Sequence, residues 1–256
     1  HQEVENILPD LEDEYKRYRL NNLAVGYRYI GDIERALNYY ERALELARSM
    51  SRESAEGVML SNISRSYRYL GEMGKSIKYA ERALEIAEEL GSVQQKNIRL
   101  RTLAINYQLQ GDDQQAYAYF ERALQLVEET ELKWQISRTK LVFAYLLAEM
   151  GELEKAMQYI EGFDVERGED AEADVVSGSS QLRLTLGQIY LTCGEVAKAY
   201  EVFEKHTYFA DLLFDNQIIV LRGVTAAVLG DQESAQANFD RGIELSHSLL
   251  TRTENL

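Results

Sequence analysis

The chain carries a regular pattern of apolar residues that is interrupted by a glycine at position 31. Before Gly31, apolar residues recur every three or four positions from Leu20, and after it they recur in the same way as far as Ala47. Such spacing places apolar side chains on one face of an α-helix. Gly31 is expected to adopt the left-handed conformation that ends a helix, and Asp32 is expected to cap the next one. This stretch therefore predicts two helices joined by a tight turn.

The same pattern returns along the chain at a fixed interval. The equivalent glycines, which stand 40 residues apart, are Gly31, Gly71, Gly111 and Gly151. An alanine or a serine occurs seven positions before each glycine and five positions after it. Small side chains at these places would let the two helices of a pair approach to about 8 to 9 Å. A fixed period in this range indicates stacked supersecondary units.

Two further and less regular copies follow, around Gly194 and Gly230. We therefore predict one all-α domain over residues 1–256 with about six helical hairpins. Their expected limits are about 11–50, 51–90, 91–130, 131–162, 175–208 and 209–250.

Between the fourth and fifth hairpins, residues 163–180 lack a clean helical stripe. This segment has six acidic residues and one arginine, which gives it a net charge of −5. Like charges and the absence of an apolar face favour an irregular, exposed and mobile loop. We also expect a shortened second helix in the fourth hairpin.

The third copy shows the pattern most clearly. A leucine, small residues, aromatic residues and a glycine recur there at fixed places, which are Leu103, Ala104, Tyr107, Gly111, Ala116, Phe120 and Ala123. This pattern resembles the tetratricopeptide repeat family. The period of 40 rather than the usual 34 resembles the longer variety found in kinesin light chains and bacterial signalling regulators. The resemblance implies a right-handed superhelical solenoid whose first helices line a concave wall.

Overall composition and charge limit the classes of function that the chain can have. The net charge of −15 opposes nonspecific binding to nucleic acid or to an anionic membrane surface. No apolar run reaches the 18 residues of a membrane span. The chain begins at His1 without a methionine, so it is expected to be processed or excised, and a targeting segment upstream would not be visible. We expect a cytoplasmic protein.

Candidate chemistry is sparse. The three histidines have no histidine or cysteine neighbour at metal-ligand spacing, and Cys193 is the only cysteine. The sequence Gly74-Lys75-Ser76 resembles the end of a phosphate loop, but Tyr69 stands where that motif needs another glycine. No nucleophile and base can be paired. We therefore predict neither catalytic activity nor a cofactor or metal site.

Charge separates between the two helices of each hairpin. The expected first helices of the first four hairpins sum to +7, whereas their second helices sum to −9. The resemblance places first helices on the concave wall, where amides, guanidinium groups and phenol rings could hold a peptide. The predicted partner-binding residues on this wall are Asn21, Asn22, Arg28, Tyr29, Asn62, Arg65, Arg68, Tyr69, Arg101 and Gln108.

The C-terminal half of the same wall is expected to be apolar. Its expected residues include Leu141, Leu184, Val220, Val224 and Val228. These features indicate a module that binds an acidic or amphipathic protein or peptide segment. By resemblance, it would be the sensor or regulatory part of a larger signalling or regulatory protein. The alternative is a structural scaffold or a self-assembling adaptor without a peptide ligand.

Overall fold

The computed structural model describes residues 12–130, 133–163, 175–205 and 212–254. Within these residues every regular element is an α-helix, as the apolar pattern predicted. The helices form two compact units, His1–Glu129 and Thr130–Leu256, which we call unit 1 and unit 2 and describe separately. The prediction of a single domain and the right-handed sense of the superhelix remain predictions.

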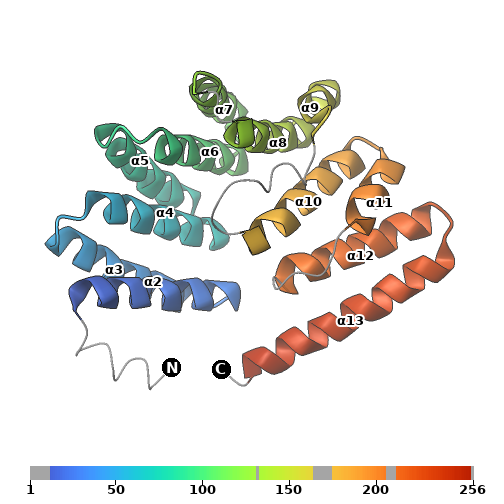
Figure 1. The fold of residues 1–256 in the computed structure, drawn as a ribbon, viewed down its shortest axis with the longest axis horizontal. Helices are drawn as coiled ribbons and strands as arrows, with labels where there is room; N and C mark the ends of the chain where they lie inside the picture. The colour runs from blue at the N-terminus through green and yellow to red at the C-terminus, as the bar shows by residue number, and fades with distance from the viewer. Residues whose placement is uncertain (1–11, 131–132, 164–174, 206–211, 255–256) are drawn as a thin grey trace. The chain divides into compact units, whose positions relative to one another are not determined.

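Unit 1 consists of three helical hairpins of nearly equal length. Their helices are α2 (Asp13–Tyr29), α3 (Ile33–Ser49), α4 (Glu53–Tyr69), α5 (Met73–Glu89), α6 (Val93–Gln110) and α7 (Asp113–Glu128). Helices α2 and α3, α4 and α5, and α6 and α7 pack as pairs. Helix α3 also packs on α4, and α5 on α6, so the hairpins stack in chain order (Figure 1).

The turns of these hairpins have the expected chemistry. Gly31 has φ +82°, a left-handed conformation that residues with a Cβ rarely adopt, and the equivalent glycines share it. At the start of α3, the Asp32 side chain accepts a hydrogen bond from the Arg35 backbone N–H at 3.1 Å. Asp112 caps α7 in the same way. The glycine and aspartate roles predicted from the sequence are therefore confirmed.

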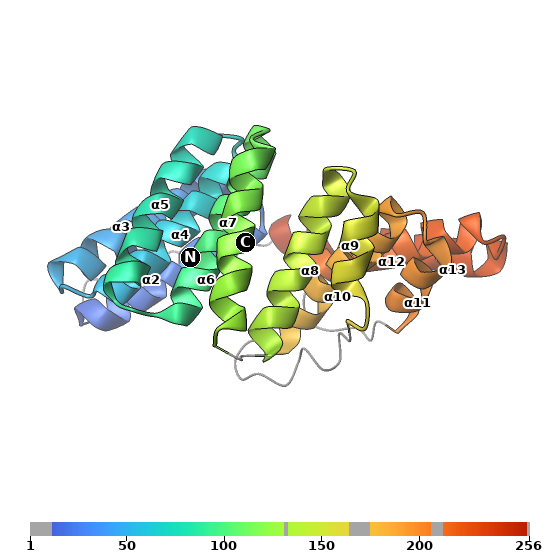
Figure 2. The ribbon, with the colours of Figure 1, turned by 90° about the horizontal axis from the view of Figure 1, so that it is seen from above.

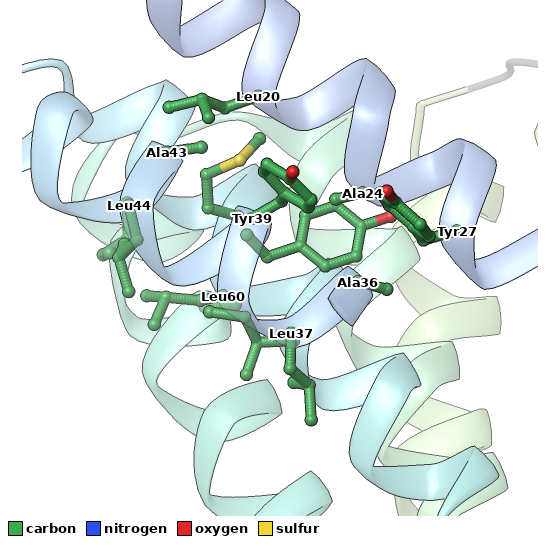
Figure 3. Packing of buried hydrophobic residues seen from close by; sticks show 14 residues of the cluster. Leu20, Ala24, Tyr27, Ala36, Leu37, Tyr39, Ala43, Leu44 and Leu60 are labelled. Carbon is green, nitrogen blue, oxygen red and sulfur yellow. The ribbon is translucent and has the colours of Figure 1, made fainter. Parts of the chain in front are cut away.

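The core of the first hairpin follows the apolar stripe. Ala24 and Ala36 are fully buried where the helices cross, and Tyr40 is fully buried beside them. At the margin of this core, the Tyr27 and Tyr39 rings stack with centroids 5.3 Å apart (Figure 3). Equivalent tyrosine pairs stack in the other two hairpins of unit 1. Burial of these rings and alanines ties the two helices of each hairpin together.

Unit 2 is less regular than unit 1, because its helices differ more in length. Figure 2 shows these helices from above. They are α8 (Lys133–Glu149), α9 (Leu153–Ile160), α10 (Val175–Thr192), α11 (Val196–Glu204), α12 (Leu212–Val228) and α13 (Gln232–Glu254). Helices α9 and α11 have only 8 and 9 residues, so the expected short second helix of the fourth hairpin is present. Helix α10 packs on α8, α11 and α12.

The predicted acidic loop at 163–180 overlaps the predicted fifth hairpin at 175–208, and in the overlap the hairpin is correct and the loop is wrong. Residues 164–174 lie outside the described residues, so the prediction is untested there. Residues 175–180, however, belong to α10. The reason is visible in the charge pattern, because Asp174 is the last acidic residue of the run and no charged residue follows before Arg183. Without that repulsion, the stretch continues into the apolar stripe of α10.

Candidate functional site

The first helices of unit 1 present a polar face that does not enter the core. We call it the first-helix face and define it by the ten predicted binding residues, Asn21, Asn22, Arg28, Tyr29, Asn62, Arg65, Arg68, Tyr69, Arg101 and Gln108. All ten are half-buried or exposed, and they lie on α2, α4 and α6. The apolar stripes of these helices point into the core, which leaves this set on the remaining surface.

Two asparagines connect neighbouring hairpins on this face. The Asn62 side-chain amide of α4 donates to Asn21 Oδ1 of α2 at 3.1 Å. Asn21 in turn donates to Asn22 Oδ1 at 3.4 Å. Each amide still has hydrogen-bonding capacity, because an amide offers two donors and one oxygen with two lone pairs. The pair can therefore hold the two helices in register and still bond to an extended backbone.

Three arginines of α2 and α4 form a positively charged cluster near these asparagines. We call Arg28, Arg65 and Arg68 the arginine cluster. The Arg28 guanidinium lies 4.8 Å from the centroid of the Tyr29 ring. Tyr69 adds a second exposed phenol ring to the cluster. The three side chains interact electrostatically with one another, so their positive charges are concentrated in one place.

The pKa values reflect this concentration. Burial lowers the pKa of Arg65, and the charge of Arg28 lowers it further. Burial and the charge of Arg65 lower the pKa of Arg68 to about 10, so Arg68 stays protonated at neutral pH. Burial opposes the charge of Arg28 as well, but the Tyr40, Tyr69 and Tyr29 phenols outweigh it and raise the pKa of Arg28. The cluster is thus charged and poorly solvated.

A buried polar chain fixes the position of Arg68. The Arg68 guanidinium donates to Asn106 Oδ1 of α6 at 3.4 Å. Asn106, which is fully buried, donates to Ser64 Oγ at 3.3 Å. Ser64 and Ser76 each donate to the other's backbone carbonyl at 2.8 Å. The crossing of α4 and α5, where the sequence predicted only small packing residues, therefore also anchors the arginine cluster to α6.

Helix α6 adds two further arginines to the first helices of unit 1. Arg99 is buried and donates to Gln95 Oε1 at 2.7 Å, and burial together with the charge of Arg65 lowers its pKa to about 10. Arg101 donates to Asn97 Oδ1 of its own helix at 3.4 Å. Gln108 is half-buried near the end of α6. Arg99 thus belongs to the same electrostatic environment, whereas Arg101 is held within α6.

Acidic residues are placed away from this charge. On α2 and α4 the carboxylates stand only in the first turns, and α6 carries none. The arginine cluster stands in the C-terminal halves of its helices, where positive charge also interacts favourably with the helix dipole. In the part of the chain that the structure describes, no carboxylate forms an ion pair with Arg28, Arg65 or Arg68.

Sequence reasoning missed Tyr40, Asn106 and Arg99. A signal existed for the first of them. Nine residues after each turn glycine the other hairpins have apolar side chains, namely Ala80, Phe120, Ile160, Phe203 and Phe239. Only Tyr40 adds a hydroxyl there. A polar atom at a position that is otherwise apolar indicates a role beyond packing.

The corresponding surface of unit 2 is apolar. Val220, Val224 and Val228 are 39%, 41% and 66% exposed, and their spacing of four places them along one side of α12. The prediction was wrong for Leu141 and Leu184, which are buried at 0% and 6% exposure. Those two leucines face the core because the stripe of α8 and α10 continues through them, so they do not line the surface.

Other kinds of site find no support in the described residues. Among them, no group of three or more histidine, cysteine, aspartate or glutamate side chains is placed to hold a metal ion. Within the same residues, no helix is both long and apolar enough to cross a membrane.

The stacked hairpins define the class of protein, a helical-hairpin repeat protein. Residues 20–54 and 54–129 match family models described as tetratricopeptide repeat. The matched residues 20–129 therefore agree with the resemblance to this family that the sequence showed. No curated protein sequence gives a significant match.

Solved structures of TPR-like proteins share the fold. BtubC (BKLC) from P. vanneervenii is 21% identical, with TM-score 0.64 over 85% of this chain and 92% of that one. A Rap protein complexed with Competence and Sporulation Factor is 19% identical, with TM-score 0.64 over 96% and 68%. A signal-transduction ATPase with a tetratricopeptide repeat sensor, from Pyrococcus horikoshii, is 14% identical, with TM-score 0.56 over 98% and 40%.

Proposed function

We propose that the chain is a protein- or peptide-binding module that holds an acidic or amphipathic partner segment on the first-helix face of unit 1. The observation that carries the proposal is the arginine cluster, which has no carboxylate partner among the described residues although the whole chain has a net charge of −15. An acidic partner would neutralise this charge and would be steered toward it.

The remaining residues of the face suit an extended or helical ligand. The amides of Asn21 and Asn62 can bond to a peptide backbone, and the exposed rings of Tyr29 and Tyr69 can pack on its side chains. Tetratricopeptide repeats are typically non-catalytic, and we propose no catalytic activity, cofactor, nucleic-acid partner or membrane insertion for this chain. The proposed location is the cytoplasm.

The similar structures support two parts of the proposal. The Rap protein of the same fold is seen in complex with Competence and Sporulation Factor, so this fold accommodates a bound partner. The Pyrococcus horikoshii protein has its tetratricopeptide repeats as a sensor within a longer chain, of which this chain matches 40%. We therefore propose a sensor or regulatory role within a larger protein.

Selection from a random peptide library displayed on phage tests this function with the full chain. We expect enrichment of acidic or amphipathic sequences. Replacing Arg65 and Arg68 with alanine should weaken binding of a selected peptide by about 1 to 3 kcal/mol for each charge-assisted hydrogen bond that the substitutions remove. The matched control is Arg82→Ala, because Arg82 lies on a second helix and already pairs with Glu85. Equal binding by the double variant, with its helicity intact, would contradict the proposal.

A self-assembling adaptor is the second candidate function, and the exposed valines of α12 favour it. Val220, Val224 and Val228 form an apolar strip that a second copy of the chain could cover. Sedimentation equilibrium of wild type and Val224→Asp tests this candidate. A dimer that dissociates in the variant would support it, and a wild-type monomer at high concentration would exclude it.

A further inference from the structure

The arginine cluster differs from several other arginines of unit 1 in having no carboxylate partner among the described residues. Arg17, Arg35, Arg48 and Arg82 each pair with a carboxylate. Arg28, Arg65 and Arg68 have no such partner within the residues that the structure describes, and the Arg28 Nε is buried without a hydrogen bond. Concentrated guanidinium groups of this kind are costly unless an anion neutralises them.

The Tyr40 hydroxyl adds a fourth group at the same place. Tyr40 is fully buried, and its hydroxyl interacts with the guanidinium of Arg28. It lies close enough to Arg28 and Arg65 to interact electrostatically with both. The fold does not require this hydroxyl, because Phe120 and Phe203 fill the equivalent positions and are also fully buried. The oxygen therefore serves as a hydrogen-bonding group beneath the arginines rather than as part of the packing.

The number of positive charges and hydrogen-bond donors in the arginine cluster favours a phosphate monoester over a carboxylate as its ligand. A single carboxylate has one negative charge and two oxygens, which would leave most of three guanidinium charges unbalanced. A phosphate monoester carries a charge of about −1.5 to −2 at neutral pH and has three terminal oxygens. Guanidinium groups bind such oxygens in two-pronged geometry. The exposed rings of Tyr29 and Tyr69 stand beside the cluster and could contact the group that carries the phosphate.

We propose that Arg28, Arg65 and Arg68 bind a phosphate monoester, the phosphorylated side chain of a bound peptide, and that the buried Tyr40 hydroxyl acts through Arg28. This assignment of the ligand rests on the proposed peptide-binding function, but the phosphate contact itself can be measured without a peptide. Asn106 is the positioning residue, because it holds Arg68 through its side-chain oxygen.

The test titrates the full chain with phenyl phosphate and, separately, with succinate at constant ionic strength and pH 7.5. Binding is followed by the NMR signals of the arginine side-chain N–H groups. We expect saturable binding of phenyl phosphate, at least about tenfold tighter than that of succinate, because only the monoester places nearly two charges on one group. Equal affinity for the two would assign the cluster to carboxylates and overturn the inference, as would an absence of saturation by phenyl phosphate.

Single substitutions test whether phenyl phosphate binds at the arginine cluster. Arg65→Gln should weaken binding of phenyl phosphate about tenfold or more, because it removes a charged donor. Tyr40→Phe should weaken it about threefold, because Arg28 loses the hydroxyl with which it interacts. Phenylalanine fits that position elsewhere in this chain, so Tyr40→Phe should fold, and circular dichroism checks it. Arg82→Gln is the matched control and should bind like wild type. Wild-type affinity in both Arg65→Gln and Tyr40→Phe would overturn the site.

The experiments distinguish a failure of the peptide-binding function from a failure of the phosphate assignment. If phenyl phosphate binds but the peptide library yields no ligand, the anion site stands and the peptide-binding function is wrong. If selected acidic peptides bind through Arg65 and Arg68 while phenyl phosphate does not bind, the peptide-binding function stands and the phosphate assignment is overturned.

Discussion

Units 1 and 2 use the same repeat positions for different purposes. Six residues before the turn glycine, α4 has Arg65 and α12 has Val224, and two residues before it they have Tyr69 and Val228. All four side chains are half-buried or exposed, so none is fixed by the core. The comparison teaches that the packing positions specify the hairpin, whereas the surface positions of the first helix are free to specify a partner.

The two units also differ in the residues at which the two helices of a hairpin cross. In unit 1 the residue seven before the turn glycine is Ala24, Ser64 or Ala104, whereas in the last two hairpins of unit 2 it is Gly187 or Gly223. Phe203 and Phe239 lie against these two glycines. The aromatic ring thus occupies the volume that a side chain has in unit 1.

The largest expected effect comes from placing a side chain in that volume. Gly187→Ala adds a Cβ that would overlap the fully buried ring of Phe203. We expect a decrease of about 1 to 3 kcal/mol in the free energy of unfolding. Urea unfolding measures it. Combining Gly187→Ala with Phe203→Leu should recover part of the decrease, and full stability of the single variant would contradict this account of the crossing.

An effect of similar size is expected at the polar crossing of unit 1. Ser64→Ala removes the acceptor of the buried Asn106 amide and should cost about 1 to 3 kcal/mol. Adding Asn106→Leu should recover most of this stability, because unit 2 has Leu146 buried at the equivalent position. A double-mutant cycle by urea unfolding measures the coupling. Additive effects would show that the two side chains do not depend on each other.

A smaller effect of the opposite sign is expected at Gly26 of α2. A Cβ on Gly26 would meet no atom within 4 Å, in contrast to Gly187. Gly26→Ala should therefore raise the free energy of unfolding by about 0.5 to 1 kcal/mol, because alanine favours the helix. Thermal unfolding measures the gain, and destabilisation would indicate a contact that the structure does not show.

The smallest effect is expected for exchanging surface residues between the units. Tyr69→Val and Val228→Tyr place each unit's side chain on the other, and the two native residues are 58% and 66% exposed. Each should change stability by less than about 0.5 kcal/mol. A larger destabilisation by Tyr69→Val, seen in thermal unfolding, would mean that this ring supports the fold and is not free for a partner.

The sequence was sufficient for the hairpins and insufficient for the contacts between them. Gly31, Asp32 and Ala24 act locally, through backbone conformation, capping and close packing, so their roles follow from spacing alone. The link from Arg68 through Asn106 to Ser64 joins residues 38 and 42 positions apart, and no local pattern reveals such a contact.

In the candidate site, too, the sequence predicted what depends on helical spacing and missed what depends on contacts between helices. The sequence placed Arg28, Arg65 and Arg68 on one surface, because helical spacing determines which residues share a face. The contribution of Tyr40, on the following helix, was missed because a buried tyrosine was interpreted as packing, although the equivalent positions of the other hairpins lack a hydroxyl. Leu141 and Leu184 were assigned to the surface for a related reason, because where apolar residues occur on several sides of a helix the spacing does not distinguish the buried side.

Mapping the bound ligand tests the central claim most directly. A library-selected peptide is added to the full chain, and hydrogen–deuterium exchange is compared with and without it. We predict protection in α2, α4 and α6 and disappearance of that protection in the Arg65→Ala, Arg68→Ala double variant. Protection confined to α12 and α13, or retained in the double variant, would contradict the claim that the first-helix face of unit 1 is the binding surface.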